Sequence, residues 1–299
     1  MIKNQEEFKV VIERCLGKEI IQFSLFGKGA VNNAYLIQTS DGAKYIVKQE
    51  KEVQEFKPQN TLLVEAHIAQ ELEKAELNIP IPKVVFISEK PVMYGYHYIE
   101  GNLMISIWNS LTNDEKINIC RTLGTFHAEL GRKISKESAV EMGVLINDSK
   151  GLHPETEEEY DSILKSNDVP DEWKLLAQHA KNMFDATFDK TVFQFIHNDA
   201  HHENIIIQDN KIVGIIDFGN TEYGEVVKEF SRYIRDYPDY FQHIVSAYEE
   251  SSGNNLSYER LVSNAFISGL IDIVEDYRKG GDTRAKAEKS IEVYRKLLD

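Results

Sequence analysis

Cysteine is nearly absent from this chain of 299 residues, which carries only Cys15 and Cys120. Two cysteines so far apart provide no disulfide framework, and their scarcity is typical of proteins from a reducing compartment. No apolar run approaches the length that spans a membrane, and the acidic, polar start lacks the features of a signal peptide. We therefore expect a cytoplasmic protein with no membrane segment.

Positive charge is also scarce, because 34 Lys and Arg stand against 49 Asp and Glu, which gives a net charge of -15. Nucleic acids reward clustered Lys and Arg, so this balance argues against a nucleic-acid partner. A negative surface suits cationic small molecules, although it also simply keeps many proteins soluble. The sequence shows no internal repeat and no low-complexity tract. Its length suits one large bilobal unit or two ordinary domains, and a hydrophobic fraction of 42% is enough to build a packed core.

The stretch from residue 195 to 219 contains three polar groups at fixed distances: His197-Asn198-Asp199, then Asn204, then Asp217-Phe218-Gly219. Phosphoryl transfer requires that an acceptor hydroxyl be positioned, that its proton be accepted, and that metal neutralise the phosphate charge. A carboxylate in the first group can face the hydroxyl. The amide oxygen of Asn204 and the carboxylate of Asp217 can bind the metal.

The surrounding sequence predicts strands that bring these groups together: 192–196, 204–207 and 212–216. Asn204 opens one strand of the predicted hairpin and Asp217 ends the other, so both can converge on one ion. Either triplet alone is more often a capped turn, and only their combination favours a catalytic site. We interpret His201 and His202 as surface or packing residues, because magnesium prefers oxygen ligands.

The N-terminal part predicts a helix that Asn4 can cap and Gly17 ends. A β-meander follows, with strands 20–26, 34–38 and 44–48. Gly27 and Gly29 lie in the first turn, 27–33, where backbone amides can approach phosphate oxygens. A G-x-G between strands is more often an ordinary turn. It gains weight here from Lys48, which ends the third strand and can reach phosphates if a carboxylate holds it.

A carboxylate for that lysine is expected in the next helix, which Asn60 or Thr61 caps. Glu65 lies within the apolar stripe of this helix and is the favoured partner, with Glu71 as the alternative. A charge on a helix is usually solvated, so this prediction depends on Lys48 and the downstream loop.

The rest of the chain changes from strand to helix. Strands over 83–88 and 92–99 precede a lobe boundary near 97–102, and a helix from residue 113 or 114 ends at Gly131. A charged helical insertion over 150–190 is expected near the acceptor cleft. The C-terminal part predicts four helices: 225–236, 239–251, 256–279 and 283–298.

These residues together resemble the aminoglycoside phosphotransferase family, a bacterial branch of the protein-kinase-like fold, over nearly the whole chain. The resemblance implies an α+β, bilobal fold. A small antiparallel sheet with one main helix would form an N-terminal lobe, residues 1–100, and a larger, mostly helical lobe would span 102–299. The H-N-D form and the segment 94–101 are similar to the 2''-phosphotransferases and macrolide kinases in particular.

The resemblance also implies roles for individual residues. Asp199 would be the catalytic base or orient the acceptor hydroxyl, and Asn204 and Asp217 would bind Mg²⁺. Lys48, held by Glu65, would bind the nucleotide phosphates. The remaining nucleotide contacts would come from backbone groups of His97 and Ile99 to the purine, with Tyr96 at the gatekeeper position. A bulky aromatic there goes with use of GTP in relatives, so ATP and GTP both stay open as donors.

The acceptor side departs from the family pattern, since Gly224-Glu225-Val226 replaces the usual Gly-Asp-Pro and Lys228-Glu229-Phe230-Ser231 replaces an Asp-rich segment. An aminoglycoside is the favoured acceptor, because an acidic C-terminal lobe would attract a polycation. The candidate acceptor-binding residues are Glu225, Asp236, Asp272 and Glu275.

Several alternatives remain open at this point. The acceptor could be a macrolide or a metabolite such as a sugar, a choline-like molecule or an amino alcohol, and an apolar cleft would favour the macrolide. A catalytically silent binding module is disfavoured by the intact Lys48, Asp199, Asn204 and Asp217. A protein kinase is disfavoured because no activation segment ends in A-P-E. The sequence is compatible with a monomer or a homodimer.

Overall fold

The computed structural model describes residues 5–29, 31–51, 59–149, 151–152 and 154–298. The chain divides into two compact units, each built from separate segments. The first unit comprises Met1–Leu111, Lys133–Ile146 and Asp199–Glu222, and the second comprises Thr112–Arg132, Asn147–Asn198 and Tyr223–Asp299. The sequence predicts one boundary near residues 97–102, whereas the structure groups the segment that carries Asp199, Asn204 and Asp217 with the N-terminal sheet.

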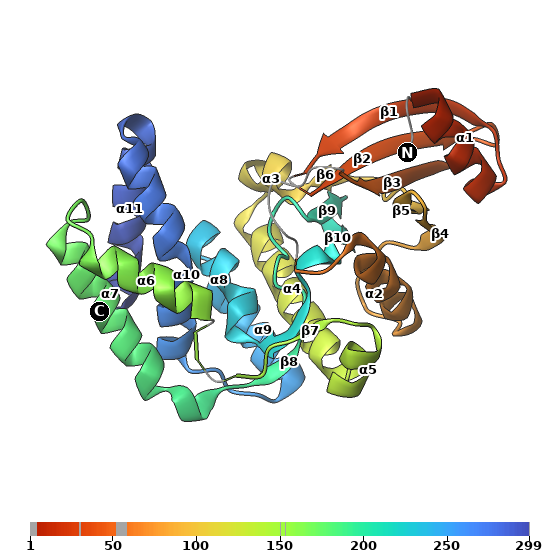
Figure 1. Cartoon of the computed structure of the whole chain (residues 1–299). Coiled ribbons are helices and arrows are strands. Elements are labelled where there is room, and N and C mark those ends of the chain that lie inside the picture. Colours follow the sequence, from red (N-terminus) through yellow and green to blue (C-terminus); the bar gives the residue numbers. More distant parts are fainter. Residues whose placement is uncertain (1–4, 30, 52–58, 150, 153, 299) are drawn as a thin grey trace. The chain divides into compact units, whose positions relative to one another are not determined.

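Within the described part of the first unit, five antiparallel strands form a sheet in the order β1-β2-β3-β5-β4 (Figure 1). This confirms the predicted antiparallel sheet near the N-terminus. The strands are β1 Ile20–Lys28, β2 Asn32–Thr39, β3 Lys44–Glu50, β4 Val84–Glu89 and β5 Val92–His97.

One helix covers each face of this sheet. Helix α1 (Gln5–Leu16) packs Phe8 and Ile12 against one face, where Tyr45 and Val47 of β3 point. Helix α2 (Leu62–Lys74) packs Leu62 and Ala66 against the other face, together with Ile46 of β3. Side chains alternate between the faces of a strand, so Lys48 points to the same side as Ile46 and α2.

The remaining elements of the first unit support the stretch that carries Asp199, Asn204 and Asp217. Strands β9 (Ile205–Gln208) and β10 (Lys211–Ile215) form the predicted hairpin, with positive φ at both turn residues, Asp209 and Asn210, as a tight hairpin turn requires. The other elements of this unit are β6 Asn102–Leu103, α3 Met104–Ile107, η1 Trp108–Ser110, α5 Lys136–Glu141, β7 Leu145–Ile146 and η3 Phe218–Asn220.

A glycine allows the chain after β5 to lie against this hairpin. Strand β6 pairs with β9, and Gly101 directly before it has a φ of 147°. A Cβ on Gly101 would lie 2.7 Å from Ile206 and 2.8 Å from the carbonyl oxygen of Ile207. Another residue would therefore push β6 away from β9 and disturb the segment expected to hold the purine.

The second unit is mostly helical and is organised around helix α10 (Tyr258–Lys279), which packs against α6, α7, α8 and α11 (Figure 1). The predicted insertion appears as α6 and α7, and the four predicted C-terminal helices appear as α8 to α11. The further elements are α4 Asn113–Lys133, α6 Pro154–Lys165, α7 Asp171–Ala186, η2 Phe188–Lys190, β8 Phe193–Ile196, β11 Glu222–Glu225, α8 Val227–Asp236, α9 Phe241–Ser252 and α11 Gly281–Leu298.

Helix α4 does not end at Gly131, as its sequence predicts, but continues to Lys133. The glycine serves packing instead, because a Cβ there would lie 2.3 Å from the side-chain oxygen of Gln194. None of the helices in the described ranges is both long and apolar enough to cross a membrane.

Candidate active site

Lys48 and Glu65 form an ion pair in the interior of the first unit. The Nζ atom of Lys48 donates a hydrogen bond of 2.6 Å to Oε1 of Glu65, and only 12% and 2% of these side chains are exposed. The pair forms because β3 and α2 present both residues to the same side of the sheet. The alternative partner, Glu71, instead accepts from Lys74 on the helix surface.

Tyr94 completes this pair and was not among the residues that the sequence indicated. It lies directly opposite Lys48 in the β3–β5 register, and its hydroxyl donates to Oε1 of Glu65 at 3.0 Å. Burial raises the pKa of Glu65, and the neighbouring Lys48 opposes that shift. The alternation of Tyr94 and Tyr96 along β5 was the available signal, because it places both rings on the face of Lys48.

Lys48 also reaches the polar end of the hairpin. Its Nζ donates to Oδ1 of Asp217 at 2.9 Å, and 44% of the Asp217 side chain is exposed. Burial opposes the charge on Lys48, but Asp217 and Glu65 together raise the pKa of the ammonium above its usual value. The lysine therefore stays charged at neutral pH, and two of its three N–H donors are taken.

Asn204 is held beside Asp217 by the hairpin, as its sequence predicts. The amide of Ile216 donates to the carbonyl oxygen of Asn204 at 3.0 Å, which brings Asp217, the next residue, close to Asn204. The side-chain Nδ2 of Asn204 donates to the carbonyl of Asp199 at 2.8 Å, which leaves its amide oxygen as an available ligand.

These two oxygen donors fit a hard cation such as Mg²⁺, because one carboxylate and one amide oxygen leave most of the coordination to water and phosphates. Among the described residues, no group of three or more His, Cys, Asp and Glu is arranged to hold a metal ion. One carboxylate and one amide oxygen from the protein suit a metal that arrives with a phosphate ligand.

Asp199 lies in a tight loop of the first unit that two polar side chains flank. Nδ2 of Asn220 donates to Oδ2 of Asp199 at 3.2 Å, while Nε2 of His201 lies 3.6 Å from Oδ1. His201, for which the sequence predicts a surface or packing position, has 14% of its side chain exposed and lies beside this carboxylate. Asn220, directly after the D-F-G triplet, was also missed, since no local pattern links it to Asp199.

Asn60 anchors the D-F-G segment to the start of α2. Its Nδ2 donates to the carbonyl oxygens of Gly219, at 3.1 Å, and Thr221, at 2.7 Å. The N-cap of α2 is Thr61, whose hydroxyl accepts from the amide of Val64. Asn60 is thus not a helix cap but a clamp that joins segments about 160 residues apart in sequence.

In the second unit, Glu229 holds the residues that precede Asp199. Its Oε2 accepts from the backbone amides of His197, at 2.6 Å, and Asn198, at 3.0 Å, and the side chain is buried. Asn198 has a positive φ of 61°, which asparagine tolerates better than most residues. Burial lowers the pKa of the neighbouring His127 to about 3, so that imidazole is neutral.

In the segment 97–99, which is predicted to contact the purine, the first two backbone amides already donate hydrogen bonds within the protein. The amide of His97 donates to the carbonyl oxygen of Lys83 at 3.1 Å, and the amide of Tyr98 donates to the carbonyl oxygen of Lys44 at 3.0 Å. The side chain of Ile99 packs against β10 at Gly214. Tyr96 is buried and stacks on Tyr94, with ring centroids 5.7 Å apart, so its ring closes the Lys48 side of the sheet.

The glycines of the first turn behave as parts of a tight β1–β2 connection. Gly27 lies at a register shift in the β1–β2 pairing, and the amide of Gly29 donates to the carbonyl of Asn32 at 3.0 Å. Ala30, in the same turn, lies outside the described residues.

One family of enzymes matches most of the chain. A model of the phosphotransferase enzyme family (APH) matches residues 22–261. The chain belongs to this family. The family resemblance expected from the motifs is thereby confirmed, and the stretch 195–219 and Lys48 both lie inside the matched range. A comparison with curated proteins finds no match.

Solved structures of other phosphotransferases share the fold of this family member. The GDP and kanamycin complex of the aminoglycoside enzyme APH(2'')-IIia has a TM-score of 0.69 at 17% identity, covering 98% of this chain and 97% of that one. The GDP complex of wild-type aminoglycoside 2'-phosphotransferase-IIIa has a TM-score of 0.67 at 15% identity, covering 99% of each chain. Macrolide 2'-phosphotransferase MphH from Brachybacterium faecium has a TM-score of 0.66 at 14% identity, covering 94% and 96%. These matches confirm the α+β kinase-like fold.

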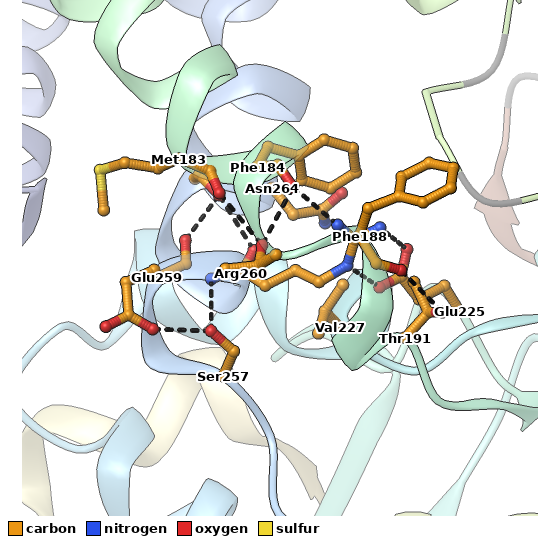
Figure 2. Close-up of polar contacts among 12 residues, drawn as sticks. Met183, Phe184, Phe188, Thr191, Glu225, Val227, Ser257, Glu259, Arg260 and Asn264 are labelled. Carbon is orange, nitrogen blue, oxygen red and sulfur yellow. Dashed lines mark hydrogen bonds and ion pairs between the residues drawn. The ribbon is translucent and has the colours of Figure 1, made fainter.

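Glu225, one of the residues expected to bind the acceptor substrate of this phosphotransferase, instead binds an arginine. Glu225 is buried, and its two carboxylate oxygens accept from Nε and Nη2 of Arg260, the latter at 2.8 Å (Figure 2). The remaining nitrogen, Nη1, donates to the carbonyl oxygen of Phe184 at 2.8 Å, and the guanidinium lies over the ring of Phe184. Glu225 therefore joins α10 to β11 and uses both oxygens in doing so, which corrects its assignment as an acceptor ligand.

Cations accompany the other three acidic candidates. Asp236 and Asp272 both pair with Arg235, at 2.9 and 3.3 Å. Glu275 is exposed one helical turn beyond Asp272 on α10. Of these three, Asp272 alone lines the polar pocket of about 300 Å³ in the second unit, and its partner Arg235 lines the same pocket.

Proposed function

We propose that this protein is a small-molecule kinase that transfers the γ-phosphoryl group of ATP or GTP to a hydroxyl group. The contact of Lys48 with both Glu65 and Asp217 carries this proposal. A buried lysine held between two carboxylates, with one N–H donor left over, is suited to bind the phosphates of a nucleotide. A purely structural ion pair would be expected to use all of its donors within the protein.

The other residues of the first unit supply the remaining requirements. Asp199 would orient the acceptor hydroxyl and accept its proton, while Asn220 fixes one oxygen of that carboxylate. Asn204 and Asp217 would hold Mg²⁺, which when bound would neutralise phosphate charge. Asn60 and Glu229 would keep the two ends of the catalytic stretch in place. The cytoplasm, where ATP and GTP are plentiful, is the proposed location.

The solved relatives indicate the acceptor classes to test first. Their names refer to kanamycin and streptomycin for aminoglycoside enzymes, and to macrolides for others. We include both classes and simple hydroxylated metabolites. The pocket of the second unit has polar and charged lining, which is unlike the apolar cleft expected for a macrolide.

The decisive experiment is nucleotide turnover with Mg²⁺, measured for ATP and GTP separately against each acceptor class, with Asp199→Ala and an exposed-site variant, Asp282→Ala, as matched comparisons. We expect acceptor-dependent release of ADP or GDP by the parent protein and by Asp282→Ala only. Tight nucleotide binding without turnover by any acceptor would support a silent binding module. If Asp199→Ala turned over as fast as the parent protein, Asp199 would not be the residue that orients the acceptor hydroxyl and accepts its proton.

A further inference from the structure

A histidine lies two residues after Asp199, in the loop that leads to Asn204. Nε2 of His201 lies 3.6 Å from Oδ1 of Asp199, and both side chains are largely shielded from solvent. The ring of His201 also packs edge-on against the ring of His202, with centroids 5.5 Å apart. The imidazole of His201 is therefore held beside the carboxylate that the proposed reaction uses.

Backbone hydrogen bonds fix the place of this ring relative to Asp199. The amide of His201 donates to the carbonyl oxygen of Asp199 at 2.8 Å, and the carbonyl oxygen of His201 accepts from the amide of Asn204 at 2.8 Å. Nδ2 of Asn204 donates to the carbonyl of Asp199, also at 2.8 Å. The main chain from Asp199 to Asn204 is thus a hydrogen-bonded turn, so side-chain rotation is the main freedom left to the carboxylate and the imidazole.

A hydrogen bond to the other ring nitrogen decides which nitrogen of His201 carries the hydrogen. The backbone amide of Glu203 donates to Nδ1 of His201 at 3.3 Å, so Nδ1 is the acceptor. The carboxylate of Glu203 lies farther away, 3.9 Å from Nδ1, and is mostly exposed. A neutral imidazole that accepts at Nδ1 carries its hydrogen at Nε2. That N–H lies on the side of the ring that faces Oδ1 of Asp199.

Each oxygen of Asp199 thus has a neighbour with an N–H group. Nδ2 of Asn220 donates to Oδ2 at 3.2 Å, and Nε2 of His201 faces Oδ1 at 3.6 Å. The terminal torsion of an aspartate is broad, so one contact leaves the carboxylate plane able to turn, whereas contacts on both oxygens fix it. The distance to His201 is slightly longer than a hydrogen bond, as is common at catalytic sites before substrate binds.

We propose that His201 is a positioning residue for phosphoryl transfer: its Nε2–H holds Oδ1 of Asp199, so that the carboxylate presents one fixed lone pair to the acceptor hydroxyl. This inference rests on the proposed kinase function. His201 does not itself take the proton of the acceptor, because its accepting nitrogen, Nδ1, is used by the amide of Glu203. It acts through Asp199, since a base must be aligned with the proton that it removes.

Two amide substitutions separate this role from simple support of the loop. His201→Gln provides an N–H at the reach of Nε2, whereas His201→Asn provides an acceptor at the reach of Nδ1, for the amide of Glu203. His201→Ala removes both groups. His67→Ala, at an exposed histidine of α2 in the same unit, is the matched control for loss of an imidazole.

We expect kcat to fall by about tenfold in His201→Ala and His201→Asn, but by no more than about threefold in His201→Gln. KM for the nucleotide should stay within about twofold of the parent value in all three, because His201 contacts the base and not the nucleotide. In an Asp199→Ala background, adding His201→Ala should lower the residual rate by less than about twofold, since the route through Asp199 is already gone. His67→Ala should match the parent protein.

Nitrogen NMR of protein labelled with ¹⁵N-histidine tests the geometry without any turnover. The signals of His201 are identified by their loss in His201→Gln, and they should have the pattern of a neutral ring with its hydrogen at Nε2. Asp199→Ala should shift these signals and leave those of His67 in place. If no acceptor is phosphorylated, the proposed function fails, and the NMR signals still decide whether the ring faces Asp199.

Any of four results would overturn the inference, and full activity of His201→Ala is the most direct. Rescue by His201→Asn but not by His201→Gln would limit the ring to holding the amide of Glu203. An undiminished effect of His201→Ala in the Asp199→Ala background would show that the ring acts independently of that carboxylate. A hydrogen found at Nδ1 would remove the contact with Oδ1 on which the inference depends.

Discussion

Two buried ion pairs of this protein, one in each unit, use their donors in different ways. In the second unit, Arg260 gives Nε and Nη2 to Glu225 and Nη1 to Phe184, and both charged side chains are almost fully buried. In the first unit, Lys48 gives two of its three donors to Glu65 and Asp217, and nearly half of Asp217 is exposed. A pair that uses all of its groups holds structure together, whereas a pair with a donor to spare and a partly exposed carboxylate can bind a ligand.

Replacement of Arg260 should therefore give the largest loss of stability. Arg260→Met leaves Glu225 buried without its partner, and we expect the free energy of unfolding to fall by about 3–5 kcal/mol. Denaturant unfolding followed by circular dichroism measures this. The double change Arg260→Met with Glu225→Gln should recover part of the loss, because it also removes the buried charge. A single variant as stable as the parent would show that the pair is dispensable.

Replacement of Lys48 should act on turnover. Lys48→Met removes a preorganised cation, and we expect kcat/KM for the nucleotide to fall by about 10²–10³. Its stability loss should be smaller than that of Arg260→Met, because Asp217 is partly solvated and burial already favours the protonated form of Glu65. Lys44→Met, an exposed lysine on the same strand, is the matched control and should behave like the parent. An equal stability loss in the Lys48 and Arg260 variants would erase the distinction between the two pairs.

Glu229 combines features of both pairs, since it is buried in the second unit but binds the backbone before Asp199. Glu229→Gln keeps the shape and an acceptor oxygen but removes the charge from two hydrogen bonds of 2.6 and 3.0 Å. We expect kcat to fall by about tenfold while nucleotide affinity stays unchanged. Steady-state kinetics that separate kcat from KM check this. A change confined to KM would contradict a role in positioning Asp199.

The contrast between the two pairs also explains what the sequence could reveal. The Lys48–Glu65 pair follows from local rules, because strand alternation and helix spacing each place one residue on a known face. The hairpin that joins Asn204 to Asp217 follows in the same way from two apolar runs and a polar turn. Contacts that depend only on the residue periodicity of a single strand, helix or hairpin could therefore be predicted.

Residues whose role depends on distant partners were missed or misassigned. Asn60 binds carbonyls about 160 residues away, and Glu225 meets an arginine 35 residues further along the chain. No periodicity links such positions, so an acidic residue near the catalytic stretch was indistinguishable from an acceptor ligand. The total charge is equally silent about local arrangement, because a sum over the chain does not show that Lys228, Arg232 and Arg235 of α8 line one pocket.

Tyr94 allows the most delicate test of the contrast, because its hydroxyl contacts the Lys48 pair without carrying charge. Tyr94→Phe removes the 3.0 Å hydrogen bond to Glu65 and leaves the bond between Lys48 and Glu65 in place. We expect a loss of about 1 kcal/mol in the free energy of unfolding, with kcat/KM lowered by no more than about threefold. Tyr258→Phe, at an exposed tyrosine of the second unit, is the control for loss of a hydroxyl. If Tyr94→Phe instead lowered kcat/KM as strongly as Lys48→Met, the orientation of Glu65 would limit turnover. The spare donor of Lys48 would then matter less than the rigidity of its carboxylate partner.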